Sequence, residues 1–272
     1  MRLSRLAMLC LGALSLSACG SDKVTSPTLP PLATVRFINA LSDTGAVDIR
    51  PVDQVEFSAS ANNLAYRAGT LYQPAEAGVR RFRIFLTSTD INVTSHVMAE
   101  PSVTLLANTR VTLLLTGTAR TGNIALWVID DASTPPPAGQ IGVRLVNAAP
   151  GVVNGYVVNT VTTALPASPT FQDIASLIRS SYINRAMGAA AVRVTDAGSS
   201  AVTASGAGPN SPTTLPGEKP AAGVNSQGTV FSVYMFAPGA AGSANSTVVS
   251  PSLIWFVDRN PCDDPPVAAC IQ

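Results

Sequence analysis

The stretch "VRFINALSD", from Val35 to Asp43, is repeated later in the chain as "VRLVNAAPG", from Val143 to Gly151. Side chains two positions apart in a β-strand lie on the same face of the sheet, and apolar residues occupy such positions in both copies. We therefore interpret the copies as the opening strands of two versions of one module, rather than as two halves of a site. The side chains predicted to face the two cores are Val35, Phe37, Val143 and Leu145.

Further landmarks repeat in the same order, which distinguishes a duplication from chance similarity. Tyr72 and Gly78 correspond to Tyr182 and Gly188. "FRI" from Phe82 corresponds to "VRV", and "LWVIDD" corresponds to "IWFVDR". On this alignment both copies close with an aromatic strand that ends in an aspartate, at Asp130 and Asp258.

Composition and local patterns predict an all-β protein. Charged residues make up 12% of the chain, and short alternating runs are separated by turn residues. In "VRRFRIFL" the apolar Phe82, Ile84 and Leu86 alternate with arginines, as in a half-buried strand. "TRVTLLLTG" and "IALWVIDD" are predicted to form strands for the same reason. We predict two tandem antiparallel β-sandwich domains, Ig-like or transthyretin-like, at residues 34–131 and 140–260, joined by a proline-rich linker at 132–139.

The first residues have the layout of an export signal. Arg2 and Arg5 precede an apolar run that is too short to span a bilayer, so residues 1–18 are predicted to be a signal peptide. "LSAC", ending at Cys19, resembles the lipobox of bacterial lipoproteins, which implies lipidation of Cys19. The alternative is an ordinary secretory peptide cut near Ala18. Residues 19–33 are predicted to form a flexible, lipidated tether.

Two cysteines remain near the carboxyl terminus, in "CDDPPVAAC". In an oxidising compartment Cys262 and Cys270 are expected to form a disulfide that closes the tail at 261–272. A structural zinc ion needs four ligands, which two cysteines and a single histidine do not supply. No metal site and no cofactor are predicted.

The charge balance argues against nucleic-acid binding. Without the signal peptide the chain carries 15 basic and 16 acidic residues. The densest basic spot, formed by Arg80, Arg81 and Arg83, is read as a solvated strand face rather than a nucleic-acid surface.

The sequence offers few groups for catalysis. His96 is the single histidine, and no G-x-S-x-G motif presents a serine. The acidic pairs Asp130–Asp131 and Asp263–Asp264 are interpreted as turn and cap residues, because neighbouring strand residues point to opposite faces. Asp43 and Asp48 could offer oxygen ligands to calcium, although their spacing matches no defined loop.

Polar residues shared by both copies have structural interpretations. Asn39 and Asn147 end the repeated strands, where asparagine commonly bonds its own backbone in a turn. Tyr72 and Tyr182 are expected to be half-buried anchors whose hydroxyls reach a polar partner. Gly78 and Gly188 are expected to take a backbone conformation that other residues resist.

The second copy departs from the first in two places, which is where a divergent function would lie. In "PTFQDIASLIRSSY" apolar residues recur at roughly helical spacing, and we expect a short helix capped by Thr170, or an irregular crossover. Residues 196–228 contain almost no large apolar side chain and are predicted to form a long exposed excursion, with a polar edge strand in its first half.

The motifs resemble the DUF4397 family of exported bacterial proteins. The resemblance rests on "VRFINA", on "SDTGAVDI" with Asp48, on Tyr72 with Gly78, and on "TRVTLLLTG". In the second copy Asn154 takes the place nearest to Asp48. The resemblance implies β-rich modules that are often duplicated and anchored to a membrane, and it implies no particular biochemical activity.

These observations favour a non-catalytic envelope lipoprotein that acts as an interaction or carbohydrate-binding module. By resemblance to the lipoprotein sorting rule, Gly20 and Ser21 favour the outer membrane, on its periplasmic face or at the cell surface. Expected partners are the membrane, through the lipid anchor, and an envelope glycan or protein. The alternatives are a hydrolase of envelope polymers, using His96 or the 196–228 excursion, and a purely structural envelope component.

Overall fold

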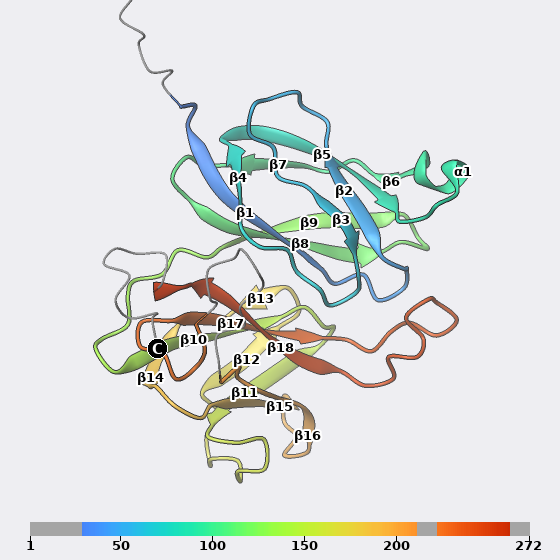
Figure 1. Cartoon of the computed structure of the whole chain (residues 1–272). Helices are drawn as coiled ribbons and strands as arrows, with labels where there is room; N and C mark the ends of the chain where they lie inside the picture. Colours follow the sequence, from blue (N-terminus) through green and yellow to red (C-terminus); the bar gives the residue numbers. More distant parts are fainter. Residues whose placement is uncertain (1–28, 211–221, 262–272) are drawn as a thin grey trace, which may run out of the picture. The chain divides into compact units, whose positions relative to one another are not determined.

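In the described part of the chain, residues 29–210 and 222–261 of the computed structural model, the regular elements are β-strands and one four-residue helix (Figure 1). The predicted all-β class and the two tandem β-sandwiches are confirmed. We call β1–β9 the first unit and β10–β18 the second unit, and both belong to a compact body that begins at Pro31. No helix in these two described ranges is long and apolar enough to cross a membrane.

The first unit contains the four-residue helix and nine strands. They are β1 (Leu32–Asn39), β2 (Val47–Pro51), β3 (Ala61–Leu64), β4 (Gln73–Glu76), β5 (Gly78–Leu86), α1 (Ile91–Thr94), β6 (Val97–Ala99), β7 (Ser102–Leu105), β8 (Arg110–Thr118) and β9 (Asn123–Asp130).

The second unit repeats this arrangement without the helix. Its strands are β10 (Gln140–Asn147), β11 (Val152–Val158), β12 (Phe171–Ala175), β13 (Ile178–Arg179), β14 (Ile183–Ala186), β15 (Ala191–Asp196), β16 (Val202–Ala207), β17 (Val230–Phe236) and β18 (Ser252–Arg259).

Each unit is a sandwich of two sheets with the same strand order. One sheet runs β4-β1-β8-β9 in the first unit and β13-β10-β17-β18 in the second, with β14 also paired to β10. We call these the facing sheets. The outer sheets run β3-β2-β5-β6, with β7 also paired to β5, and β12-β11-β15-β16. One pair in each facing sheet, β1–β8 and β10–β17, is parallel, and the other pairs are antiparallel.

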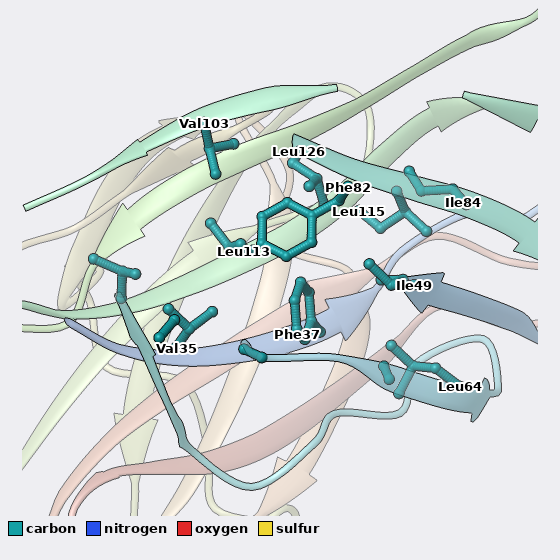
Figure 2. Close-up of a cluster of buried hydrophobic side chains, with 14 of the residues drawn as sticks. Val35, Phe37, Ile49, Leu64, Phe82, Ile84, Val103, Leu113, Leu115 and Leu126 are labelled. Carbon is teal, nitrogen blue, oxygen red and sulfur yellow. The ribbon is translucent and has the colours of Figure 1, made fainter. Parts of the chain in front are cut away.

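Each sandwich encloses its own hydrophobic core, as the strand patterns predict. Val35 and Phe37 of β1 are fully buried in the first core, where the ring of Phe37 meets that of Phe82 from the outer sheet at 5.4 Å, edge to face (Figure 2). Val143 and Leu145 take the matching positions in the second core. That each unit is a separate domain, with boundaries at 131 and 140, stays a prediction.

The two facing sheets pack against each other through the sides that point away from the cores. Ile38 and Leu114 of the first unit form one buried cluster with Val146, Tyr234 and Phe236 of the second. These side chains follow or precede core residues by one position, so the central strands of both facing sheets are apolar on both faces.

A cluster of buried charges lies within this apolar contact. Arg36, on β1, reaches into the second unit and donates from Nη2 to Asp258 Oδ1 at 2.7 Å. Arg144, on β10, reaches into the first unit and donates from Nη2 to Asp131 Oδ1. All four side chains are at most 3% exposed. Each unit therefore gives an arginine to the other and receives one in return.

The neighbours of these ion pairs repeat in the same reciprocal way. The hydroxyl of Tyr72 donates to Asp131 at 2.7 Å, and that of Tyr182 donates to Asp258 at 2.8 Å. Each guanidinium also lies over the tyrosine ring of its own unit, with Arg36 4.6 Å from the Tyr72 centroid and Arg144 4.4 Å from that of Tyr182. Burial raises the pKa of both tyrosine hydroxyls, which keeps them protonated as donors.

Strand hydroxyls complete the cluster. Arg36 Nε donates to Thr112 Oγ1 at 3.0 Å, and Arg144 Nε donates to Ser232 Oγ at 2.6 Å. Each hydroxyl then donates to the aspartate of its own unit, Asp131 or Asp258. A buried ion pair is tolerated when further hydrogen bonds satisfy both partners, and here every member has them.

This arrangement corrects two interpretations of the sequence. The aspartate that corresponds to Asp258 is Asp131, one residue later than the aligned tryptophans suggest. The residue before each aspartate shows this, because the carbonyl of Asp130 accepts from Arg144 Nη1 and the carbonyl of Val257 accepts from Arg36 Nη1. The interpretation of Asp131 as a turn or cap residue is also wrong, because its side chain is a member of the buried cluster and is only 1% exposed. The repeated "VR" motifs are thus opening strands and, at the same time, the two halves of one buried cluster.

Replacing Arg36 with alanine is expected to lower the free energy of unfolding by about 3–5 kcal/mol, because it leaves buried carboxylate charge uncompensated. Urea unfolding of the whole chain measures this. The matched control is Arg83→Ala, which removes an arginine that is 46% exposed beside Glu100 and should barely move the midpoint. Equal losses from the two variants would show that the cluster does not stabilise the contact between the units.

Candidate functional site

A polar groove of about 760 Å³ lies on the outer sheet of the second unit. It is formed by β11 and β15, by the loop between β11 and β12, and by the turn between β15 and β16. The residues that line it include Asn154, Tyr156, Leu165, Arg193, Ser199 and Ser200. The groove thus lies where the two copies of the module differ in sequence.

The direction of β11 fixes which side chains face the groove. Gly155 points into the core, where an added Cβ would lie 2.7 Å from Leu145 Cδ2 and 3.0 Å from Phe171 Cδ2. A side chain at this position would clash, so glycine is required by the close approach. Because strand residues alternate, Asn154 and Tyr156 lie on the opposite, outer face.

Strand register places the remaining groove residues. Tyr156 lies opposite Arg193, and Asn154 lies opposite Thr195. Tyr156 is 8% exposed and packs with Leu165 from the loop that covers this face. The loop therefore rests on the sheet and forms one wall of the groove.

Arg193 is held in place without a carboxylate partner among the described residues. Its Nη1 donates to the carbonyl oxygen of Thr163, in the covering loop. Its Nε is buried and has no hydrogen-bond partner among the described residues. The hydroxyl of Thr195, on the same face, is likewise buried and has no hydrogen-bond partner among them. Buried polar atoms in folded proteins nearly always have a hydrogen-bond partner, and where the protein supplies none, a bound ligand or an ordered water can take that place.

The polar residues shared by both copies have the structural roles predicted for them. Asn39 Oδ1 accepts from the backbone of Leu41, and Asn147 Oδ1 accepts from that of Ala149, so both close a turn after the first strand. The predicted polar partners of Tyr72 and Tyr182 are the two aspartates of the buried cluster.

The predicted glycine positions are also confirmed. Gly78 and Gly188 have φ values of 113° and 119°, in the region that other residues rarely adopt.

Asp48 and Asn154 occupy equivalent positions and accept equivalent bonds. Asp48 Oδ1 accepts from the backbone of Asn63 at 2.9 Å, and Asn154 Oδ1 accepts from that of Asp173 at 2.8 Å. Both donors have positive φ, 50° and 51°. The shared function of Asp48 and Asn154 is to hold a left-handed residue in the neighbouring strand.

The aspartates considered for calcium already have protein partners. Asp43 accepts from the backbone of Ala119 and Arg120, both at 3.0 Å. Asp48 accepts from Thr87 and Arg50 in addition to Asn63. Within residues 29–210 and 222–261, no three His, Cys, Asp or Glu side chains are grouped to hold a metal.

His96 is exposed and lines a smaller apolar pocket of about 310 Å³, beside α1 in the first unit. Leu86, Val93 and Met98 also line this pocket. Among the described residues the His96 ring forms no hydrogen bond with a serine or a carboxylate, so no triad is assembled around it.

The helix expected in "PTFQDIASLIRSSY" is wrong, because the segment forms β12 and β13. Phe171 and Ile174 are both buried although they are three positions apart. A register shift in the pairing with β11 and the positive φ of Asp173 bring them to the same face. Thr170 caps no helix, and its hydroxyl accepts from the backbone of Val157 at 3.1 Å.

The 196–228 excursion is partly as expected. Its first half contains the predicted edge strand, β16, which pairs with β15. Val224, however, is fully buried in the second core, so this part of the excursion is not an exposed loop. Cys19, Cys262, Cys270, Asp263 and Asp264 lie outside the described residues.

The sequence interpretation missed Arg36, Arg144 and Arg193. Buried arginines are rare, and a charged residue in a strand is normally assigned to the solvated face. The available signal was the recurrence of arginine after valine in both opening strands. Nothing comparable marks Arg193, whose environment depends on a loop contact.

Asp48→Asn, which introduces the residue found at the equivalent position in the second unit, is expected to lower the melting temperature at pH 7. Burial opposes ionisation of Asp48, but hydrogen bonds from Asn63, Thr87 and Arg50 outweigh it and lower the pKa. A lowered pKa stabilises the fold above the unfolded value of about 4, and this stabilisation is lost as the pH falls through the folded pKa. The gap in melting temperature should therefore be constant from about pH 7 to 5 and close below about pH 4. A gap that does not narrow at all as the pH falls below about 4 would contradict this assignment.

Comparisons with known proteins find a matching sequence family for part of the chain. No curated protein matches the sequence significantly. Among solved structures, an α-glucan-binding streptococcal virulence factor is 18% identical, with 62% of this chain and 83% of that chain covered and a TM-score of 0.20. Family 41 carbohydrate-binding modules from streptococcal virulence factors are 11% identical, with coverage of 81% and 96% and a TM-score of 0.24. The fimbrial anchor protein Mfa2 from Porphyromonas gingivalis is 7% identical, with coverage of 84% and 99% and a TM-score of 0.21.

These TM-scores are too low for the ligands or assemblies of those proteins to say anything about this chain. The sequence-family match is more informative. Residues 33–157 match the model of the domain of unknown function DUF4397, from β1 of the first unit to β11 of the second. Residues 33–157 are therefore similar to the DUF4397 family, in agreement with the resemblance that the repeated motifs indicate.

Proposed function

We propose that this protein is a non-catalytic interaction module that binds a glycan in the groove of the second unit. The observation that carries the proposal is the groove itself, an open polar depression walled by a loop that the first unit lacks in this form. Binding sites are typically concave and contain a few convergent polar groups, and this groove has both properties.

The groove offers hydrogen-bonding groups suited to sugar hydroxyls. A hydroxyl both donates and accepts, so a sugar needs partners of both kinds. Ser199 and Ser200 supply hydroxyls, Tyr156 supplies a phenol, and Arg193 supplies N–H donors. The amide nitrogen of Asn154 adds a donor, since its oxygen already accepts from Asp173.

The same lining does not favour hydrolysis. Glycoside hydrolysis normally uses a pair of carboxylates on opposite sides of the scissile bond. None of the described residues that line the groove is an aspartate, glutamate or histidine. A binding role is therefore better supported than the alternative of an envelope-polymer hydrolase.

Filling the groove should abolish glycan binding without disturbing the fold. Ala167 is exposed on the groove wall, and Ala167→Trp would occupy the space where a sugar ring would sit. The matched control is Ala107→Trp, at an exposed turn position of the first unit. On a glycan array, the whole wild-type chain and the Ala107→Trp variant should bind a common set of glycans that the Ala167→Trp variant loses. Binding that survives the tryptophan in the groove, or no binding by the wild type, would contradict the proposal.

The envelope location belongs to the same proposal, with Cys19 as the site of lipidation. Cys19→Ala is expected to move the protein from the membrane fraction to the soluble fraction, because acyl chains contribute about 0.8 kcal/mol per buried methylene. Cys10→Ala, a change within the predicted signal peptide, should leave the protein in the membrane fraction and serves as the control. A Cys19→Ala variant that still sediments with membranes would overturn this assignment. A disulfide between Cys262 and Cys270 remains part of the proposal.

A further inference from the structure

The outer sheet of the first unit neutralises its own arginines. Arg50 Nη2 lies 2.9 Å from Asp48 Oδ2, and Arg83 Nε lies 2.7 Å from Glu100 Oε2. Arg81 lies 3.2 Å from the other oxygen of Glu100. Each of these three arginines therefore has a carboxylate within salt-bridge distance.

The second unit has lost both of these carboxylates. On β11, Asn154 replaces Asp48, and Tyr156 replaces Arg50, since Arg50 lies opposite Arg83 and Tyr156 lies opposite Arg193. The position of Asn154 follows from the same register.

The second lost carboxylate is Glu100. Ile84 pairs with Ala99, which directly precedes Glu100, whereas in the second unit Ser205 lies opposite Arg193. Serine thus stands where the first unit has its glutamate. Arg193 is retained, whereas the equivalents of Glu100, which pairs with Arg83, and of Asp48, which pairs with Arg50, are not acidic.

Arg193 is also fixed in position. Its bond to the Thr163 carbonyl anchors one end of the guanidinium to the covering loop. Among the described residues its buried Nε has no hydrogen-bond partner, and no carboxylate forms an ion pair with Arg193. A guanidinium that is held in place and not neutralised is preorganised for an anion, because little side-chain freedom is lost on binding.

We infer that the ligand of the groove is an acidic carbohydrate whose carboxylate is bound by Arg193, an inference that rests on the proposed function. The planar guanidinium matches a carboxylate in geometry, and a charge-assisted pair is stronger than a neutral hydrogen bond. One uncompensated positive charge in the groove matches one carboxylate per sugar residue. Ser200 remains available for the sugar hydroxyls, and Ser199, whose oxygen accepts from the backbone of Ala201, can still donate to them.

Calorimetric titration of the whole chain tests this with three probes, oligogalacturonate, its methyl ester and a neutral maltooligosaccharide, and with a sulfated glycan as a second acidic class. Oligogalacturonate should bind at least about tenfold more tightly than its ester at low salt, and added salt should reduce the difference. Arg193→Gln should bring the affinity for the acid down to that for the ester. Arg83→Gln, the equivalent arginine of the first unit, should change neither affinity, and thermal unfolding of both variants checks that they fold.

The outcomes separate the inference from the proposed function. Equal binding of acid and ester, sensitive to Ala167→Trp, would overturn the acidic ligand while leaving glycan binding intact. Preference for the acid that survives Arg193→Gln would place the anion site elsewhere and overturn the assignment to Arg193. Absence of binding by all three probes and by a sulfated glycan would overturn both. Binding of the sulfated glycan alone would overturn the inference that the group bound by Arg193 is a carboxylate.

Discussion

The exchange of arginines between the two units is the interaction on which the rest of the structure depends. Arg36 binds Asp258 of the second unit, and Arg144 binds Asp131 of the first. A buried guanidinium without a partner would cost several kcal/mol, so neither unit can bury its facing sheet against a purely apolar surface without penalty. Each unit satisfies the charge that the other buries, which makes the contact specific as well as apolar.

This reciprocity explains which parts of the module stay alike. The arginine, the tyrosine, the strand hydroxyl and the terminal aspartate form one hydrogen-bonded set in each unit, in which Tyr72 and Tyr182 have the same role. A change in any one of them leaves a buried polar group unsatisfied. The outer sheets do not share this constraint, and there the two units differ. In the first, Glu100 pairs with Arg83, and in the second no described carboxylate pairs with Arg193, which lines a groove.

Much of the fold could be predicted from the sequence because alternation reports burial directly. Val35, Phe37, Val143 and Leu145 face the cores as their positions indicate. The turn asparagines and the glycines of positive φ were equally readable, since their roles are local. Prediction failed where a strand departs from regular pleating. Phe171 and Ile174 show helical spacing in a strand, because the left-handed Asp173 and a shift in register change the alternation.

The sequence by itself determined the duplicated module, its β-strands and the residues of its two cores, because these follow from periodicity along the chain. Only the tertiary structure decided that Arg36 and Arg144 are buried, that Asp131 rather than Asp130 is the equivalent of Asp258, and that Arg193 lines a groove. A charged residue has the same local pattern whether it faces water or a partner. What separates the two cases is a carboxylate more than two hundred positions away for Arg36, and none within reach among the described residues for Arg193.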